Sequence, residues 1–290
     1  MGRLTVSMNC LGFELHDDGR LVTLYRATEE IARDESPKPC FAPIYTPDGR
    51  LITQYRPADH LWHTGLYYGW VHANGANLWG GPWYVPEKKE YVLEPGTHGR
   101  QAHESFERPF SRGGKARVVE HLTWRGADDE VMATERREMK FESLSDRPGT
   151  MWKISSLITP RGGDLHLGSS RVSFYSGLEL RMGPPFTEAN HRTGTGLRGH
   201  EAIMGRRAPW CCAVGACGGA VVMMDHPKNP RYPTTWFTRS ILLGAGLLME
   251  EDLTVPLGED LMLRYGFLVL EDDPEDGFIE AQFKRFAAST

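Results

Sequence analysis

Two histidines and a neighbouring carboxylate stand in the stretch "DHLWHTGLYYGW" at residues 59–70. A carboxylate beside a histidine fixes the imidazole tautomer, which prepares the ring for proton transfer or for metal ligation. On a β-strand, His60 and His63 would point to opposite faces, whereas a turn could place both rings on one side, next to Asp59. The spacing therefore leaves two interpretations open, a working site and a β-sheet core in which the histidines are satisfied.

A second polar stretch, "GHEAIMGRRAPW" at residues 199–210, contains a glutamate, two adjacent arginines and a tryptophan. Arg206 and Arg207 are consecutive, so on an extended backbone only one of them faces a ligand. We expect Arg207 and Trp210 to bind the substrate and Glu201 to act as an acid. Because a buried guanidinium needs a carboxylate partner, a structural ion pair between Glu201 and an arginine competes with this interpretation.

The third stretch, "DHPKNPRYPTTWF" at residues 225–237, has three prolines within seven residues. Proline fixes φ and removes an N–H donor, so this loop is expected to hold its polar side chains in set directions. A sugar ring stacks on an indole while its hydroxyls bind Asn and Arg side chains, so Asn229, Arg231 and Trp236 are predicted to bind a small sugar. The stiff loop makes His226 the best-positioned candidate base, since a misplacement of about 1 Å can reduce a rate about a hundredfold.

These residue types support two kinds of chemistry. In the first, His60 or His226 is a general base, His63 or Glu201 is the partner acid, and Asp59 contacts the substrate. In the second, His60, His63 and either His226 or a carboxylate hold a divalent metal that keeps open positions for water or substrate. Neither chemistry needs an organic cofactor.

Composition excludes several classes of protein. The 33 basic and 38 acidic residues among 290 give a net charge of −5, which does not suit a general nucleic-acid binder. No early apolar run resembles a signal peptide, and the longest uncharged run is shorter than the roughly 20 residues that span a bilayer. We therefore expect a cytoplasmic protein with no membrane or nucleic-acid partner, whose ligand is a small sugar and whose oligomeric state is open.

The five cysteines form no C-x-x-C pair of the kind that builds zinc or redox sites. Cys211 and Cys212 are neighbours, which is poor geometry for a disulfide. Reduced thiols are therefore expected at all five positions: Cys10, Cys40, Cys211, Cys212 and Cys217.

Alternating apolar and polar residues predict an all-β fold. The alternation recurs in short blocks bounded by turn residues, which is typical of a large antiparallel β-sandwich. Only the last stretch, at 273–289, has helical spacing, with Ile279, Phe283 and Phe286 on one face. No repeat or linker divides the chain, so residues 1–290 are expected to form a single domain, with site residues on the irregular segments 74–87 and 182–210.

The three quoted stretches, in this order, resemble the signature blocks of the bacterial PmoA-like domain family of unknown function. Those blocks resemble D-H-P-H-H-R-G-L-x-F, G-x-E-A-x-x-G-x-R-A-P-W-C and D-H-P-x-N-P-R-x-P-x-x-W-H, and the similarity spans roughly residues 41–272. The resemblance implies a galactose-mutarotase-like supersandwich, a fold whose relatives act on or bind sugars. The family's methane oxygenase label does not suit this chain, because no transmembrane segment or metal-rich pattern can be read in it.

Most family positions are kept and several are changed. The matching residues are Asp59, His60, His63, Glu201, Arg207, Trp210, Asp225, His226, Asn229, Arg231 and Trp236. The departures are Leu61, Trp62, Thr64, Cys212 and Phe237, followed by a changed continuation after the third block. If the changed groups take part in turnover in relatives, this chain binds without turnover or uses a different substrate.

The sequence thus predicts a carbohydrate-active enzyme of the lyase, hydrolase or epimerase type, acting on a sugar or an oxidised keto sugar by His/Glu acid–base chemistry. One alternative is a non-catalytic sugar-binding protein that uses the same face of the fold. Another is a structural or assembly module in which the histidines are core groups. Convergence of His60, His63, Glu201 and His226 within one pocket would favour the enzyme, a shallow aromatic platform with the histidines apart would favour binding, and burial without a cavity would favour the structural module. We also expect the three stretches to meet at one end of the sandwich.

Overall fold

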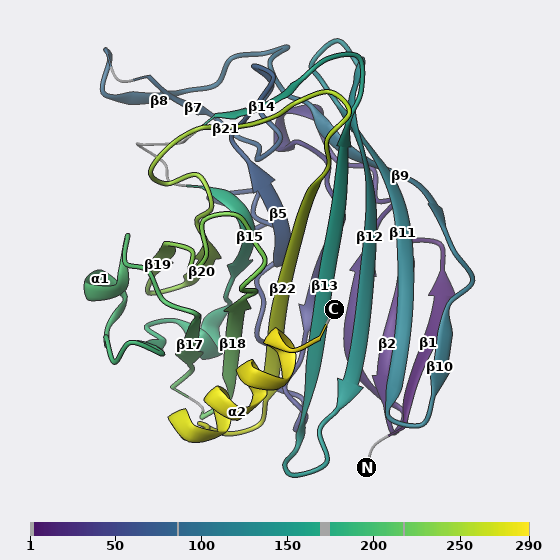
Figure 1. The fold of residues 1–290 in the computed structure, drawn as a ribbon, viewed down its shortest axis with the longest axis vertical. Helices are drawn as coiled ribbons and strands as arrows, with labels where there is room; N and C mark the ends of the chain where they lie inside the picture. Colours follow the sequence, from purple (N-terminus) through teal and green to yellow (C-terminus); the bar gives the residue numbers. More distant parts are fainter. Residues whose placement is uncertain (1–2, 86, 169–174, 217, 290) are drawn as a thin grey trace.

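Two large antiparallel sheets face each other in the computed structural model, which describes residues 3–85, 87–168, 175–216 and 218–289 (Figure 1). The first sheet has eight strands. Their order across the sheet is β1 (Leu4–Asn9), β2 (Gly12–Asp17), β3 (Arg20–Arg26), β4 (Cys40–Ile44), β5 (Leu66–Trp70), β15 (Ser176–Arg181), β20 (Leu242–Ala245) and β19 (Trp236–Arg239).

The second sheet has nine strands. Their order is β10 (Phe110–Arg112), β11 (Lys115–Arg125), β12 (Val131–Ser143), β13 (Gly149–Pro160), β22 (Leu261–Leu270), β18 (Ala220–Asp225), β17 (Trp210–Val214) and β16 (Asn190–Thr193), and β9 (Arg100–Phe106) pairs with β11 off this path. The all-β sandwich predicted from the alternation is therefore confirmed.

Short elements close the ends of the sandwich. A three-stranded sheet is made of β21 (Leu253–Val255), β14 (Leu165–Gly168) and β6 (His72–Ala73), and a hairpin of β7 (Trp83–Val85) and β8 (Glu90–Val92). The helical segments are η1 (Arg33–Glu35), η2 (Pro184–Phe186), α1 (His200–Ile203) and α2 (Asp276–Ala287). Within the described ranges, none of these helices has the length and apolar character needed to cross a bilayer.

The main core lies between the two sheets. Strands β12 and β13 alternate buried and partly exposed positions, as expected of strands with one face inward. Trp124, Trp152 and Phe267 are fully buried in this core, and the rings of Trp152 and Phe267 lie 5.4 Å apart. The long strands that position the site are thus held by contacts between large rings.

A second, smaller core lies under α2. The predicted helical face is confirmed, because Ile279, Phe283 and Phe286 are buried against strands β17, β18 and β22. Trp210 belongs to this core and not to a surface platform.

Three sequence predictions about local structure can be compared with the structure. The residues around "GACGG" form a turn between the paired strands β17 and β18, with Gly215 N–H donating to the Gly219 carbonyl, although Cys217 itself lies outside the described residues. The four described cysteines are free thiols. The segment 182–210 is more regular than expected, since it contains η2, β16 and α1.

Candidate active site

A row of cross-strand neighbours runs over the outer face of the eight-stranded sheet. Successive residues in the row are direct partners on strands β3, β4, β5, β15, β20 and β19: Arg26, Cys40, Tyr67, Glu179, Gly244 and Phe237. The residues next to them in sequence, such as Tyr68 and Leu178, belong to the inner core, and strand side chains alternate between faces. The row therefore points away from the sandwich core, toward the loops that cover this sheet.

The first signature stretch forms a turn that leads into β5. His60 N–H donates to the Pro57 carbonyl at 2.9 Å and His63 N–H donates to the His60 carbonyl at 3.0 Å, so the backbone reverses here. The two imidazole rings lie 4.9 Å apart, and His60 Nδ1 is 2.8 Å from Asp59 Oδ2. The turn interpretation is thus confirmed, with both histidines on the same side.

The His63 side chain is buried on this outer face of the sheet, whereas that of His60 is partly exposed. The His63 side chain is 1% exposed, and neither of its ring nitrogens has a hydrogen-bond partner among the residues that the structure describes. Burial lowers the pKa of His63 well below its usual range, and the charges of Arg181, His60 and Lys38 lower it further. His63 is therefore a neutral imidazole near neutral pH, with one unprotonated ring nitrogen.

Glu179 is the acid on this face. Its side chain is 4% exposed, and Oε2 accepts a hydrogen bond of 3.1 Å from Trp79 Nε1. Burial raises the pKa of Glu179 to about 8, although Trp79, Tyr67 and Lys38 act in the opposite direction. Near neutral pH this side chain is therefore mostly a carboxylic acid that can donate a proton.

Aromatic rings join the acid and the base. The ring of Trp79 lies 5.3 Å from His63 and stacks on Tyr175 at 4.1 Å. Tyr175 lies 6.0 Å from His63 and packs edge-on against Phe237 at 4.6 Å. The histidine and the glutamate are consequently held against one indole inside one aromatic enclosure, which we call the His63 site (residues 38, 62, 63, 67, 79, 175 and 179).

A buried lysine supports the walls of the His63 site. Lys38 Nζ donates to the carbonyl oxygens of Trp62 and Trp79, at 3.2 and 2.7 Å, and to those of Glu35 and Ser36, both at 3.2 Å. Burial lowers the pKa of Lys38 to about 8. The ammonium fixes the backbone of the loops that carry the two tryptophans.

Glycines leave room beside the acid. A Cβ at Gly69 would lie 2.6 Å from Trp79 Cδ1 and 3.1 Å from Glu179 Oε2. A Cβ at Gly244 would lie 3.3 Å from Glu179 Cγ. A larger residue at either position would displace the indole or the carboxyl group.

Hydrogen bonds join the second stretch (199–210) to the third (225–237). Arg207 donates to the carbonyls of Arg231 and Pro233 and forms an ion pair with Glu250. The competing ion pair with Glu201 is therefore not the one that forms. Arg231 in turn donates to three backbone carbonyls, those of Leu247, Glu251 and Asp252.

The other predicted sugar-binding residues also have partners within the chain. Asn229 binds Asp225 Oδ1 at 2.7 Å and both the N–H and the C=O of Arg264. Trp236 Nε1 donates to the Ala208 carbonyl at 2.9 Å, and Trp210 Nε1 lies 3.2 Å from Glu280. Burial raises the pKa of Asp225 to about 7, which marks it as a buried structural acid. A ligand-binding role for these residues stays a prediction without support from their contacts.

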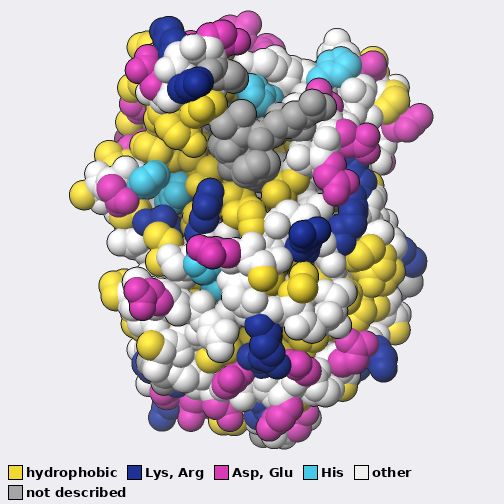
Figure 2. Space-filling model, turned by 90° about the vertical axis from the view of Figure 1, so that its left-hand side faces the viewer, with side chains coloured by type: hydrophobic (Ala, Val, Ile, Leu, Met, Phe, Trp, Pro, Cys, Tyr) yellow, Lys and Arg dark blue, Asp and Glu magenta, His cyan; other side chains and the backbone are white. Residues whose placement is uncertain are grey.

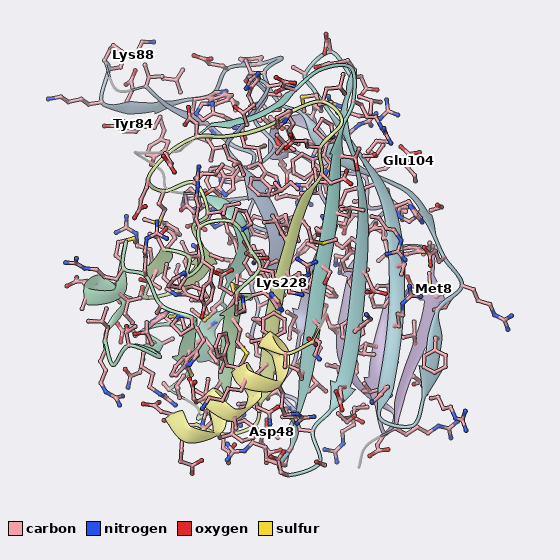
Figure 3. The ribbon with its side chains drawn as sticks, viewed as in Figure 1. Met8, Asp48, Tyr84, Lys88, Glu104 and Lys228 are labelled. Atoms are coloured by element: carbon pink, nitrogen blue, oxygen red, sulfur yellow. The ribbon has the colours of Figure 1, made fainter. Side chains whose placement is uncertain are left out.

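His226 follows strand β18 and packs against helix α2, outside the His63 site. Its Nδ1 accepts from the Lys228 N–H at 3.0 Å, its Nε2 lies 3.2 Å from the Ser289 carbonyl, and its ring packs edge-on against Phe286 at 5.1 Å. Figure 3 labels Lys228 near the C-terminus. In the described part of the chain no three His, Cys, Asp or Glu side chains are arranged to hold a metal, so the predicted set of His60, His63 and His226 is not assembled.

Glu201 is exposed on α1, which packs against β16 and β19. Among the described residues it contacts neither His60 nor His63, whereas Glu179 shares the indole of Trp79 with His63. The three stretches are linked only in part: the second and third are bonded directly, and the first reaches Phe237 through Tyr175. Figure 2 views the side that carries β19 and α1, where hydrophobic side chains gather in the upper part of the face.

Sequence reasoning missed four members of the His63 site: Lys38, Trp79, Tyr175 and Glu179. One signal was available for Glu179, because "GLELR" places an acid between two leucines of a strand that is buried at every position. Lys38 and Trp79 lie in loops whose polar contacts depend on tertiary structure, which a single sequence does not reveal.

The comparisons with known proteins identify the family. A family model described as "Family of unknown function (DUF6807)" matches residues 12–284, so the chain belongs to this family. A search of curated proteins gave no match. A solved structure titled "Crystal Structure Analysis of HI1317" is similar at 9% identity and a TM-score of 0.30, with coverage of 93% of this chain and 99% of that chain, and a TM-score of this size supports no conclusion.

Proposed function

We propose that the protein is a carbohydrate-active enzyme whose His63 site performs acid–base chemistry on a sugar or an oxidised keto sugar. His63 is the general base and Glu179 is the general acid. The observation that carries the proposal is this pair: an imidazole kept neutral by burial and a carboxyl group kept protonated by burial, both held against Trp79. Opposite pKa shifts of this kind separate the roles of acid and base near neutral pH.

The substrate class follows from the walls of the site. The rings of Trp62, Trp79 and Tyr175 surround the acid and the base in contact with one another, and rings of this kind suit the apolar C–H face of a sugar, whose hydroxyl or carbonyl oxygens the acid and base would bind. The resemblance to the PmoA-like domain family and its galactose-mutarotase-like supersandwich agrees with a sugar substrate, by analogy of fold. No contact of the site requires a charged or nucleotide-like ligand.

The reaction that suits this pair is proton abstraction next to a carbonyl group. The free nitrogen of His63 removes the proton from the carbon beside the carbonyl, and Glu179 gives its proton to the carbonyl oxygen, which produces an enol. From the enol, a proton taken from solvent on the opposite face gives an epimer, while departure of a β-substituent with the proton held by His63 gives the product of a lyase. In both cases the enol hydrogen returns to Glu179 as the carbonyl re-forms. The field of the Lys38 ammonium favours the negative charge that develops on oxygen.

The proposal is tested by hydrogen exchange at carbon. The protein is incubated in D2O with 3-keto-glucose, and NMR follows the incorporation of deuterium at the carbons next to the carbonyl. We expect His63→Ala and Glu179→Gln each to reduce the exchange rate by on the order of a hundredfold or more, as for loss of a positioned acid or base. Glu201→Gln, on the exposed α1 helix, serves as the control and should keep the wild-type rate.

Two outcomes are informative besides the expected one. Exchange at the wild-type rate in His63→Ala would exclude His63 as the base. A thermal shift with sugars that is lost in His63→Ala, without any exchange of deuterium, would favour the alternative of a non-catalytic sugar-binding protein on the same face.

A further inference from the structure

A groove of about 460 Å³ lies next to the His63 site but is not part of its proposed chemistry. It is lined by residues 26–31, by single residues of the covering loops including Lys38 and Thr64, and by the first four residues of β9. Its volume falls in the range of small-molecule sites, which is roughly 300–1,000 Å³. His103 is the histidine that lines it.

His103 is oriented by a carboxylate that has no contact with solvent. Its Nδ1 lies 2.8 Å from Glu120 Oε1, the His103 side chain is 15% exposed, and Glu120 is 0% exposed. The ring also packs against Phe106 at 4.3 Å. Because Glu120 accepts the Nδ1 hydrogen, Nε2 is the nitrogen that His103 presents to a ligand in the groove.

A network inside the sandwich core holds Glu120 in place. The Tyr25 hydroxyl donates to Glu120 Oε2, and Arg137 donates to the Tyr25 oxygen at 3.0 Å. Arg137 also forms a two-point ion pair with Glu135, at 2.7 and 3.0 Å. Every member is buried, so rotation of Glu120 away from His103 would break contacts that have no water to replace them.

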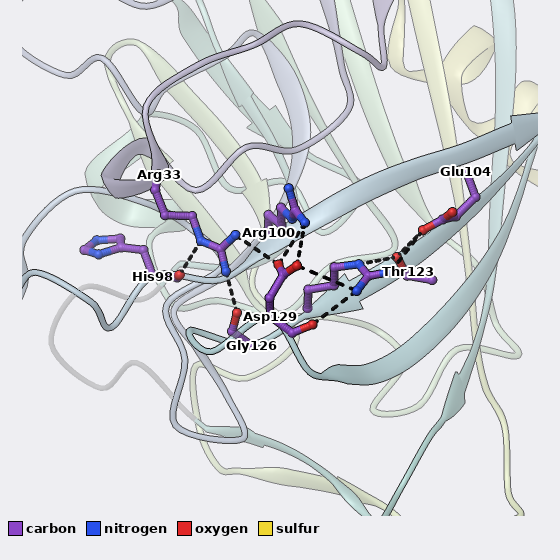
Figure 4. A network of polar contacts seen from close by, with 8 residues as sticks. Arg33, His98, Arg100, Glu104, Thr123, Gly126 and Asp129 are labelled. Carbon is purple, nitrogen blue, oxygen red and sulfur yellow. Dashed lines mark hydrogen bonds and ion pairs between the residues drawn. The ribbon is translucent and has the colours of Figure 1, made fainter.

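Ion pairs and hydrogen bonds also hold the end of the groove at β9 in place (Figure 4). Arg100 lies 2.8 Å from Asp129, which also binds Arg33, and Arg33 donates to the carbonyls of Gly126 and His98. The guanidinium groups of Arg100 and Arg33 are thus paired within the chain, and these contacts hold the wall of the groove that carries His103.

The remaining polar groups define the ligand. Arg26 is paired with Glu29 at 2.6 Å, and Lys38 is surrounded by carbonyls, whereas Glu30 is exposed and has no partner among the described residues. Glu30 and His103 Nε2 are acceptors, so they need a ligand that donates. The groove contains both signs of charge, so a neutral molecule with several hydroxyls fits it better than an ion.

We propose that this groove is a second binding site for a neutral polyhydroxylated molecule, in which His103 Nε2 accepts a hydrogen bond from a ligand hydroxyl and Glu120 positions the imidazole. The site shares Lys38 with the wall of the His63 site, but its binding groups are His103 and Glu30, and it does not depend on the reaction proposed for His63.

NMR of the full-length protein tests this site directly. Long-range ¹H–¹⁵N spectra of histidine rings report the tautomer of His103, which should carry its hydrogen on Nδ1. Titration with glucose, maltose and sorbitol should shift the His103 Nε2 resonance with saturation for at least one probe, and glucuronate should bind more weakly than glucose. His103→Ala should abolish the saturable binding measured by calorimetry, and Glu120→Gln should weaken it about tenfold and change the tautomer ratio.

Matched variants keep the test decisive. His121→Ala removes an exposed histidine that also faces a glutamate, on the same strand as Glu120 but outside the groove, and should leave binding unchanged. Glu30→Gln alters only an exposed acceptor and should weaken binding a few-fold without affecting the fold. His63→Ala should leave the groove affinity intact, which separates this site from the proposed enzyme reaction. Absence of any shift at His103 with all three neutral probes, or unchanged affinity in folded His103→Ala, would overturn the proposal.

Discussion

The protonation of Glu179 makes a quantitative prediction about stability. Its pKa is 4.5 in the unfolded chain and about 8 in the folded protein, because burial raises it. The folded protein therefore binds this proton more tightly than the unfolded chain. The resulting stabilisation is fully present below pH 4.5 and is lost as the pH rises to about 8.

The size of the effect follows from proton linkage. One pKa unit corresponds to about 1.4 kcal/mol, so the loss between these two pH values amounts to about 4 kcal/mol for this one group. Glu179→Gln removes the titration but keeps an oxygen that can accept from Trp79 Nε1. We expect the variant to gain stability relative to the wild type as the pH rises, by about 1.4 kcal/mol per pH unit, and the difference to become constant above pH 8.

Urea unfolding followed by tryptophan fluorescence at pH 5, 6, 7 and 8 measures this difference. Groups that titrate in this range away from Glu179, such as Asp225, contribute equally to both proteins and cancel in the difference, whereas Lys38 is coupled to Glu179 and adds a smaller change near pH 8. Glu201→Gln is the control, because that carboxyl is exposed to water in the folded protein. Parallel pH profiles of wild type and Glu179→Gln would refute the assignment of a buried, protonated Glu179 and remove the acid from the proposed mechanism.

Three further substitutions test the surroundings of the site. Gly69→Ala forces a Cβ against Trp79, so unfolding experiments should show a loss of about 1–3 kcal/mol, together with a changed tryptophan emission spectrum. His226→Ala removes a ring that packs on Phe286, so it should reduce the free energy of unfolding by about 1–3 kcal/mol and leave sugar affinity per folded molecule unchanged. Asn229→Ala leaves a buried carboxylate and two backbone groups without partners, and should reduce the free energy of unfolding by about 2–4 kcal/mol in urea denaturation.

The strands could be predicted from sequence because their pattern is local. Short blocks of alternating residues form strands such as β1 and β2, and the helix at 276–287 has the predicted buried face. One face of each strand must be apolar to enter the core, so apolar and polar residues alternate along the strand. The order of the strands in the two sheets depends on contacts between distant segments, and no local pattern specifies it.

The candidate site was predicted in part, for a related reason. His63 was identified because its carboxylate and aromatic neighbours are close in sequence. Glu179 lies 116 residues later and reaches the same aromatic cluster because β15 pairs with β5, with Trp79 in contact with both side chains. The Arg231 and Asn229 side chains were expected to bind a ligand because a proline-rich loop holds them. In the structure they instead bind backbone groups of the same chain.

The position of Lys38 has a consequence for the kinetics of access to the His63 site. Its ammonium holds carbonyl oxygens of three separate segments, at residues 35–36, 62 and 79. Release of one segment leaves a buried cation with fewer partners, which makes release of the others easier, so the covering loops open as one cooperative unit. Entry of a ligand then passes through a discrete open state, and the observed association rate is the diffusional rate multiplied by the small fraction of molecules in that state. We therefore expect this single internal charge to control access to the proposed site.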